Sequence, residues 1–331
     1  MVKDYDFITV GSATFDVLAR TNFSEVIKII DPKGETDLLA FPSGAKILIN
    51  ELEFSTGGGG TNAAVSLSRL GHKVAFLGKL GDGTNSEFIR KNLVNEKISM
   101  LCAHGKGMVG YSVILDTLEH DRTILAYKGI NDDLHNEDVP YKKLRAKWFY
   151  FSSMMNESFR TMEKLADFAQ KNEIKIVFNP SMYLAEKGSG FLGNVLSRTE
   201  VLVLNKEEAY LLVGNSNPND MVKKLAELGP KIVIVTDGKN EVYVYDRKYL
   251  YWAKPPQVRV VDATGAGDAF ASSFASGLIR KQKIEACMKL AVVNSMSVLS
   301  YYGAKNILLK YNEASRAVKK LKMKIFKRKI S

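Results

Sequence analysis

A carboxylate follows a short run of small residues in the segment Asp262-Ala-Thr-Gly-Ala-Gly-Asp268. Three apolar residues at four-residue spacing come next and predict a buried helix that begins near Ala266: Phe270, Phe274 and Leu278. Backbone N–H groups at a helix start lack carbonyl partners, so residues 265–267 would form an anion site that a phosphate can approach closely. Asp268 beside that site could take the proton of an attacking hydroxyl, which is phosphotransferase chemistry. A tight turn followed by a first-turn acid explains the same residues without any catalysis.

A second glycine-rich segment, Ser55-Thr-Gly-Gly-Gly-Gly-Thr-Asn62, leads into a predicted helix that closes at Gly71. Four glycines indicate close approach of the backbone to another group, and Asn62 can both donate and accept hydrogen bonds, which suits a polyhydroxylated ligand. The spacing Gly58-x-Gly60-x-x-Ala63, with Asp82 roughly 20 residues further on, also matches a loose dinucleotide fingerprint. The residues before it alternate apolar with polar, unlike the strand that feeds a dinucleotide turn. No Walker A sequence occurs, so a nucleotide would have to be held in another way.

Short apolar runs separated by helical segments must position these residues. The runs are Phe7–Val10, Val74–Leu77, Trp148–Phe151, Lys175–Phe178, Val201–Leu204 and Ile232–Val235. Helical segments such as Phe159–Lys171 and Met221–Leu228 lie between them. Continuous apolar strands that alternate with helices predict an α/β fold, a mostly parallel central sheet with helices on both faces.

Three other segments interleave apolar and polar residues, as in a small sheet with one solvated face: Lys46–Ile49, Tyr111–Leu115 and Arg122–Ala126. We predict that they belong to a β-sheet lid formed by residues of about 12–20, 36–56 and 108–130. The sequence contains no internal repeat and no proline-rich linker, so the lid is expected to be an insertion in a single domain that spans residues 1–331.

The two glycine-rich segments together resemble the signatures of the ribokinase family, also called the PfkB carbohydrate kinases. Gly-Gly-x-Gly-x-Asn occurs early and Asp-x-Thr-Gly-Ala-Gly-Asp late, and the resemblance runs from Val10-Gly-Ser-Ala-Thr-Phe-Asp16 to Tyr302-Gly-Ala-Lys305. It implies a three-layer α/β/α domain with a small β lid over the acceptor. It also implies transfer of the γ-phosphate of ATP to a hydroxyl of a sugar or sugar derivative, with Mg²⁺.

The resemblance implies a role for each matching residue. Asp268 corresponds to the general base, and Gly265, Ala266 and Gly267 to the anion hole. Acceptor binding falls to Asp16, Gly58, Gly59 and Asn62. A helix cap or an ordinary turn would account for several of these residue types as well.

Further residues match the nucleotide and metal elements of the family. Asn205-Lys-Glu-Glu208 resembles its Asn-x-x-Glu element, in which Glu208 helps to hold magnesium, largely through water. Thr236-Asp-Gly238 resembles the nucleotide turn, and Asn294 lies where the adenine pocket is often lined. Asp262 and Thr264 resemble a monovalent-cation loop of part of the family, which implies activation by K⁺.

One departure bears on the acceptor. Ribokinase-like members carry lysine in Gly-Gly-Lys-Gly, whereas this chain has Gly59, so ribose itself is in doubt as the acceptor. Lys128 in the lid could face a carboxylate or phosphate of the substrate, or could be an exposed lysine. A nucleoside kinase is the second hypothesis, a non-enzymatic sugar-binding regulator the third, and an NAD-dependent oxidoreductase the last. Intact Asp268 and its glycines argue against the regulator.

The net charge of +11 is concentrated at one end of the 331-residue chain. From Lys310 onward there are nine basic residues and one acidic residue. We interpret residues 310–331 as a solvated amphipathic helix and tail rather than a nucleic-acid arm, with Ala317, Val318, Leu321, Ile325 and Phe326 free to dock.

The remaining composition indicates a small-molecule enzyme of the cytoplasm. Two distant cysteines, an acidic N-terminus and the lack of a long apolar run predict no export and no membrane span. Lid sheets in this family often form dimer contacts, so a homodimer through the lid is a further hypothesis.

Overall fold

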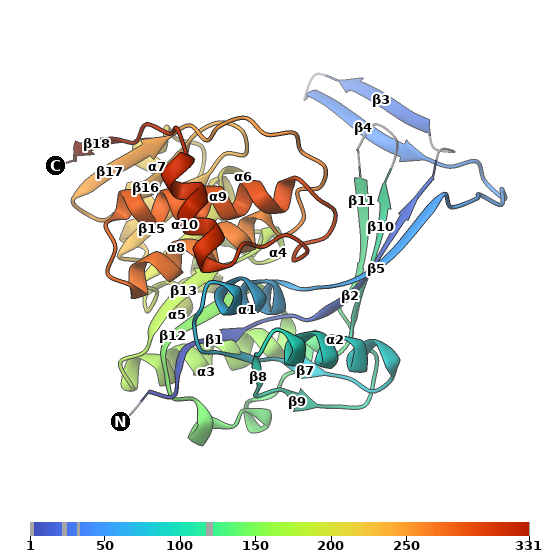
Figure 1. The fold of residues 1–331 in the computed structure, drawn as a ribbon, viewed down its shortest axis with the longest axis horizontal. Helices are drawn as coiled ribbons and strands as arrows, with labels where there is room; N and C mark the ends of the chain where they lie inside the picture. The colour runs from blue at the N-terminus through green and yellow to red at the C-terminus, as the bar shows by residue number, and fades with distance from the viewer. Residues whose placement is uncertain (1–2, 22–24, 32–33, 117–121, 331) are drawn as a thin grey trace.

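A ten-stranded sheet runs through the main body of the molecule, for which a computed structural model describes residues 3–21, 25–31, 34–116 and 122–330 (Figure 1). Its parallel part consists of β15 (Ile232–Thr236), β14 (Val201–Asn205), β13 (Lys175–Asn179), β12 (Ala146–Ser152), β1 (Tyr5–Val10), β6 (Val74–Leu77) and β8 (Ser99–Met100). Three antiparallel strands extend it beyond β15: β16 (Val242–Tyr245), β17 (Tyr249–Ala253) and β18 (Phe326–Lys329). The functional groups discussed below lie mainly at the carboxyl ends of the parallel strands.

Helices cover both faces of this sheet. One layer contains α1 (Gly59–Arg69), α8 (Ala266–Ile279), α9 (Ile284–Leu299) and α10 (Tyr311–Lys320). The other contains α3 (Asn156–Lys171), α4 (Met182–Ala185), α5 (Gly188–Leu196), α6 (Lys206–Val213) and α7 (Pro218–Glu227). Successive strand residues point to opposite faces, so Trp148 and Tyr150 join one core while Phe149 and Phe151 join the other. The predicted three-layer α/β fold is confirmed.

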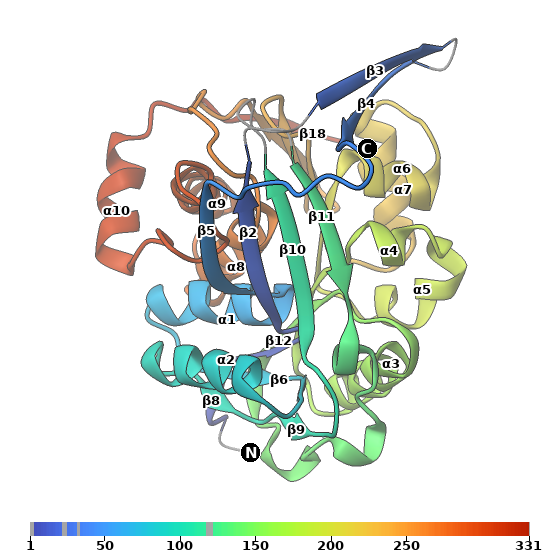
Figure 2. The ribbon, with the colours of Figure 1, turned by 90° about the vertical axis from the view of Figure 1, so that its right-hand side faces the viewer.

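A separate four-stranded sheet projects from the main body (Figure 2). Its order is β11 (Arg122–Tyr127), β10 (Gly110–Asp116), β2 (Thr14–Arg20) and β5 (Glu51–Gly57). The hairpin of β3 (Glu25–Asp31) and β4 (Gly34–Ala40) extends beyond it. Helix α2 (Thr84–Asn95) packs against β2 and β5, and a short pair, β7 (Lys79–Leu80) and β9 (Ala103–His104), lies nearby. We call the four-stranded sheet the lid.

One predicted strand is wrong, and the predicted C-terminal helix is present but shorter than the segment assigned to it. Residues 46–49 form a loop, and the strand in this region is β5, which pairs with β2 over seven positions. The C-terminal helix ends at Lys320, because Leu321, Met323 and Ile325 follow a period of two and pack against the core of the sheet, and β18 then pairs with β17. Phe326 therefore belongs to an edge strand and stacks on Trp252.

Among the described residues, no helix is both long enough and apolar enough to cross a membrane.

Candidate active site

A cavity of about 310 Å³ opens between the carboxyl ends of the parallel strands, the start of α8 and the root of the lid. The loops after β1 and β12–β15 contribute to it, as expected for a ligand site in an open α/β sheet. Its lining includes Ser12, Gly59, Lys128, Asp132, Ser152, Ser153, Asn179, Ser181, Tyr183, Asn205, Glu208, Thr236, Gly265, Gly267 and Asp268. Polar groups from five strand ends and two helix starts, those of α6 and α8, therefore share one space.

Asp268 lies in the first turn of α8 and borders this cavity. Its Oδ2 accepts a 2.9 Å hydrogen bond from Nδ2 of Asn62, and the hydroxyl of Tyr150 also contacts the carboxylate. Burial raises the pKa of Asp268 to about 6, while Asn62, the Lys305 cation and Tyr150 lower it. The carboxylate is thus mainly ionised at neutral pH and sits close to the range that suits a general base.

The start of α8 has the geometry of an anion site. Gly265 adopts a left-handed φ of 78°, and a Cβ there would come within 2.5 Å of Ala304, so the turn requires glycine. A Cβ at Gly267, by contrast, would meet nothing within 4 Å, because this position faces open space at the cavity. The Ala266 N–H donates to the Ala263 carbonyl at 3.3 Å, whereas the N–H groups of Gly267 and Asp268 precede the first full turn of helix bonds and, with the helix dipole, suit a phosphate.

The glycine-rich segment before α1 lies directly against Asp268. A Cβ built on Gly59 would lie 2.8 Å from Cβ of Ser152 and 3.3 Å from Oδ1 of Asp268. Gly58 has a φ of 91° and packs on the backbone of Ser12. The two chain segments can approach each other only because these positions carry no side chain.

Three buried polar atoms near this segment have no hydrogen-bond partner among the described residues: Oδ1 of Asp16, Oδ1 of Asn62 and Oγ of Ser152. Buried polar atoms are normally paired, so these three atoms are available to bond with a ligand that carries hydroxyl groups. Burial raises the pKa of Asp16, whereas hydrogen bonds from Thr14 and Ser112 lower it.

Asn205 and Glu208 line the cavity where β14 ends and α6 begins. They form a reciprocal capping box: Oδ1 of Asn205 accepts from the Glu208 N–H at 2.8 Å, and Oε2 of Glu208 accepts from the Asn205 N–H at 2.9 Å. Burial raises the pKa of Glu208 to about 7, despite the Asn205 hydrogen bond. Both residues also line the cavity with Thr236, so the helix cap does not remove them from it.

These groups fit magnesium bound mainly through phosphate and water. No cluster of three or more His, Cys, Asp or Glu side chains that could hold a metal occurs among residues 3–21, 25–31, 34–116 and 122–330. Mg²⁺ commonly uses one or two carboxylates plus substrate phosphates, and Glu208 can be such a carboxylate.

Behind the glycine-rich segment lies a buried lysine. Nζ of Lys305 donates to Oγ1 of Thr56 at 2.9 Å and to Oγ1 of Thr61 at 2.7 Å, and only 6% of the residue is exposed. Burial lowers its pKa to about 7, while Asp16 and Asp268 raise it. Lys305 therefore places positive potential behind the two carboxylates without bordering the cavity.

Several predicted site residues do not line this cavity, although Asn62 bonds directly to Asp268, which does. They are Asp16, Gly58, Asn62, Gly238, Asp262, Thr264, Ala266 and Asn294. Asn294 is fully buried, and its amide bonds to Ser66, Ser273 and the Leu309 N–H, so it ties α9 to the core rather than lining a nucleotide pocket. Gly238 lies in the exposed β15–β16 turn. Asp262 accepts hydrogen bonds from the N–H and hydroxyl of Thr264 and from the Gly303 N–H.

Sequence reasoning missed Tyr150, Ser152 and the role of Lys305. Tyr150 and Ser152 end a predicted apolar strand and lie on the face that α8 covers, so their period-two spacing with Trp148 was the available signal. Lys305 offered no local signal, because only the tertiary fold places it behind α1.

The sequence matches one known protein family. The sequence model of the pfkB family carbohydrate kinases matches residues 23–310, and the chain belongs to this family. It is 28% identical over 275 residues to a cytidine kinase of Thermococcus kodakarensis, covering 81% of this chain and 94% of the relative. It is 24% identical over 311 residues to an ATP-dependent 6-phosphofructokinase of Thermoanaerobacterium thermosaccharolyticum, covering 91% and 90%.

Solved structures agree on the fold. The ribokinase of Thermotoga maritima superposes with a TM-score of 0.80 at 20% identity, covering 95% of this chain and 99% of that one. The protein is thus a sugar or nucleoside kinase of the pfkB family, a phosphotransferase with an alcohol group as acceptor. ATP is the donor expected for the family, usually with Mg²⁺.

Proposed function

We propose that this chain transfers the γ-phosphate of ATP to a hydroxyl of a small sugar or sugar derivative. The observation that carries the proposal is the position of Asp268, which borders the cavity, adjoins the N-terminus of α8 and has a pKa raised toward neutrality. In this scheme the acceptor hydroxyl lies beside Asp268, among the unpartnered atoms of Asp16, Asn62 and Ser152.

The phosphoryl transfer follows from these positions. Asp268 takes the hydroxyl proton while the acceptor oxygen forms a bond to the γ-phosphorus and the bond from that phosphorus to the β,γ-bridging oxygen breaks, leaving ADP. The N–H groups of residues 265–267 stabilise the charge on the transferred phosphoryl group. Asn205, Glu208 and Thr236 face the donor phosphates, where magnesium would neutralise negative charge.

A nucleoside acceptor is the second candidate, because a cytidine kinase is among the relatives with the highest identity. The test is ATP consumption with Mg²⁺ across pentoses, hexoses, sugar acids, sugar phosphates and nucleosides, with and without K⁺, and with Asp268→Asn as control. One strong acceptor whose turnover is lost in the variant supports the proposal. A protein that binds sugars but never consumes ATP would overturn it in favour of a binding protein.

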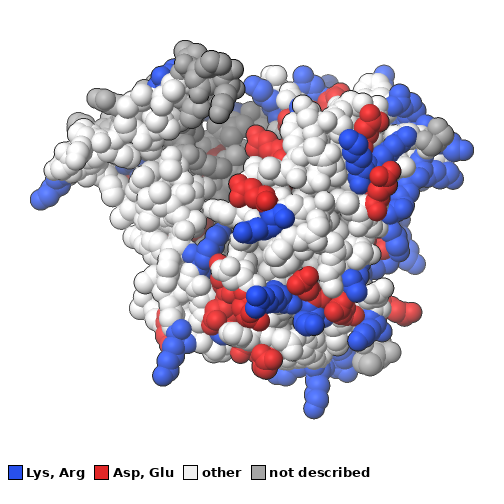
Figure 3. All heavy atoms as spheres, turned by 180° about the vertical axis from the view of Figure 1, so that it is seen from behind, with Lys and Arg blue, Asp and Glu red and all other residues white. Residues whose placement is uncertain are grey.

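We also propose a cytoplasmic homodimer that pairs through the lid. The side chains of Ile27, Leu52, Phe54 and Leu125 on the lid and its hairpin are between 48% and 56% exposed. On the face in Figure 3 the described part of the projecting region is mostly uncharged, whereas charged side chains are spread over the main body. Light scattering on the unmodified protein and on Phe54→Asp tests the dimer, and a concentration-independent monomer would contradict it.

A further inference from the structure

Lys128 stands where the lid joins the cavity, directly after β11, and no role has yet been assigned to it. Its side chain is half-buried and lines the cavity that also holds Asp268. Nζ lies 3.9 Å from the ring centroid of Tyr183, another lining residue. No carboxylate of the described residues lies within ion-pair distance of this ammonium group. A half-buried cation in a ligand cavity, attracted to Asp132 but not in ion-pair contact with a carboxylate, can accept an anionic group of a ligand.

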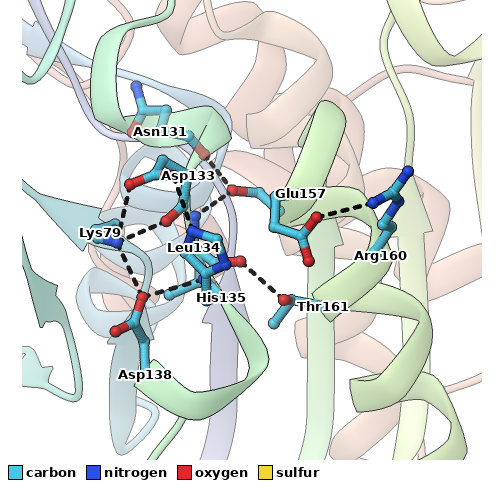
Figure 4. Close-up of polar contacts among 10 residues, drawn as sticks. Lys79, Asn131, Asp133, Leu134, His135, Asp138, Glu157, Arg160 and Thr161 are labelled. Carbon is cyan, nitrogen blue, oxygen red and sulfur yellow. Dashed lines mark hydrogen bonds and ion pairs between the residues drawn. The ribbon is translucent and has the colours of Figure 1, made fainter.

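The segment that carries Lys128 is held firmly (Figure 4). Nζ of Lys79, in the main body, bonds to the carbonyl and carboxylate of Asp133 at 2.6 and 3.0 Å and to Asp138 at 3.0 Å. Asn131 exchanges two hydrogen bonds with the backbone of Ala13, at the root of β2. The backbone that carries Lys128 is therefore fixed relative to the cavity. Less conformational entropy is lost when Lys128 binds a ligand, which favours binding.

Asp132 is the other charged residue at this corner of the cavity. It accepts a 3.3 Å hydrogen bond from Nδ2 of Asn156, and burial raises its pKa, whereas Lys128 lowers it. Burial lowers the pKa of Lys128, and attraction to Asp132 only partly offsets this. An anion held by Lys128 would thus gain from the lysine and be opposed by the aspartate.

We propose that Lys128, seated on the ring of Tyr183, binds a phosphate or carboxylate group of a ligand in this cavity. The inference rests on the proposed kinase function and deepens it. Two sources share this chemistry: a phosphate of the ATP donor, or an acidic group on the acceptor. If the anionic group belongs to the acceptor, the Lys128 ammonium would supply the cationic contact that this chain lacks at Gly59.

Lys128→Met keeps the length and apolar contact of the side chain and removes only its charge. We expect a loss of about 10- to 100-fold in affinity for the anionic ligand, the range for one hydrogen bond to a charged group. Lys128→Arg should restore part of the lost affinity, and Asp132→Asn should strengthen binding of the same anion. Lys142→Met changes an exposed lysine outside the cavity and should leave the affinity unchanged.

Two arms separate the sources, and both include binding readouts that do not depend on turnover. Calorimetry with the magnesium complex of AMP-PNP tests the donor, and KM and thermal shift with ribose 5-phosphate, fructose 6-phosphate and gluconate against ribose, fructose and glucose test the acceptor. A loss confined to AMP-PNP identifies a donor phosphate, and a loss confined to acidic acceptors identifies an acidic acceptor. If the unmodified protein binds these ligands and Lys128→Met binds them equally well in both arms, the role of Lys128 is overturned. If the unmodified protein binds neither AMP-PNP nor any of the acceptors, the kinase proposal itself fails.

Discussion

Replacement of Asp268 by asparagine should remove the catalytic base and stabilise the fold at the same time. Burial raises the pKa of Asp268 from 3.8 to about 6 in the folded chain, although Asn62, Lys305 and Tyr150 lower it. Above pH 6 the folded protein holds a carboxylate that ionises more readily in the unfolded chain, and this difference reduces the free energy of unfolding. Asparagine cannot ionise, and its carbonyl oxygen can still accept the hydrogen bond from Asn62.

The size of the gain follows from the pKa of the carboxyl group in the two states. A change from 3.8 to about 6 corresponds to about 3 kcal/mol once both states are ionised. The carboxylate borders a cavity open to water, so we expect about 2 kcal/mol in practice. Because the folded-state pKa is the higher one, stability is lost as the pH rises between these two values and the loss is complete above the second. The variant should therefore exceed the unmodified protein by about 2 kcal/mol at pH 7.5 and by about half as much at pH 5.

Urea unfolding at both pH values, together with ATP turnover, measures the two effects. Turnover should fall by about 10²- to 10⁴-fold, the usual contribution of a general base. Asp82→Asn, which changes an exposed aspartate, is the matched control and should alter neither quantity. A variant that is less stable at both pH values, or whose gain is the same at both, would refute the assignment of a buried ionised base, and near-normal turnover would refute its catalytic role.

Three further changes test the surroundings of the base. Turnover should halve near pH 6 as Asp268 is protonated. Lys305→Met should move this midpoint to higher pH, because the Lys305 cation lowers the pKa of Asp268. An unchanged pH–rate profile would exclude the electrostatic role of Lys305. Lys79→Met should lower the free energy of unfolding by about 1–2 kcal/mol, since three contacts of a buried lysine are lost, and denaturation with no change would show that the lid root is held otherwise. Gly59→Ala should reduce turnover about tenfold or more, because the methyl group meets Ser152, and Ser152→Gly in the same chain should recover part of it. Equal turnover in Gly59→Ala and the unmodified chain would contradict the close packing.

The central sheet could be predicted because its parallel strands are buried on both faces and therefore appear as apolar runs. The C-terminal segment could not, because Val318, Leu321 and Ile325 also fit helical spacing, and the choice depends on the open edge that β17 offers. Residues 46–49 alternate like a strand, yet they pair with no strand in the described part of the chain, whereas β5 pairs along its whole length with β2. Strand pairing depends on tertiary contacts that a short local pattern does not contain.

The site shows the same division between local and tertiary information. Asp268 and residues 265–267 were predictable because the start of a helix is a local feature. Asn205 and Glu208 matched both a helix cap and a phosphate-side element, and the structure shows the cap while placing both at the cavity. Asn294 was misplaced because its amide satisfies the core between helices, which spacing alone does not reveal.

The glycine-rich segment has Gly59 where ribokinase-like members carry a lysine, but the fold brings Lys305 behind the same segment. A side chain at Gly59 would collide with Ser152 and crowd Asp268, so this packing of the β12 end leaves no room for a cation in front of the loop. Lys305 acts from behind, where its charge favours the ionised forms of Asp16 and Asp268 and leaves the cavity free. A cation in that position supports the base for any acceptor and cannot distinguish one acceptor from another by contact. Selection between acceptors must therefore depend on groups that border the cavity, and among these Lys128 is the cation placed at the lid.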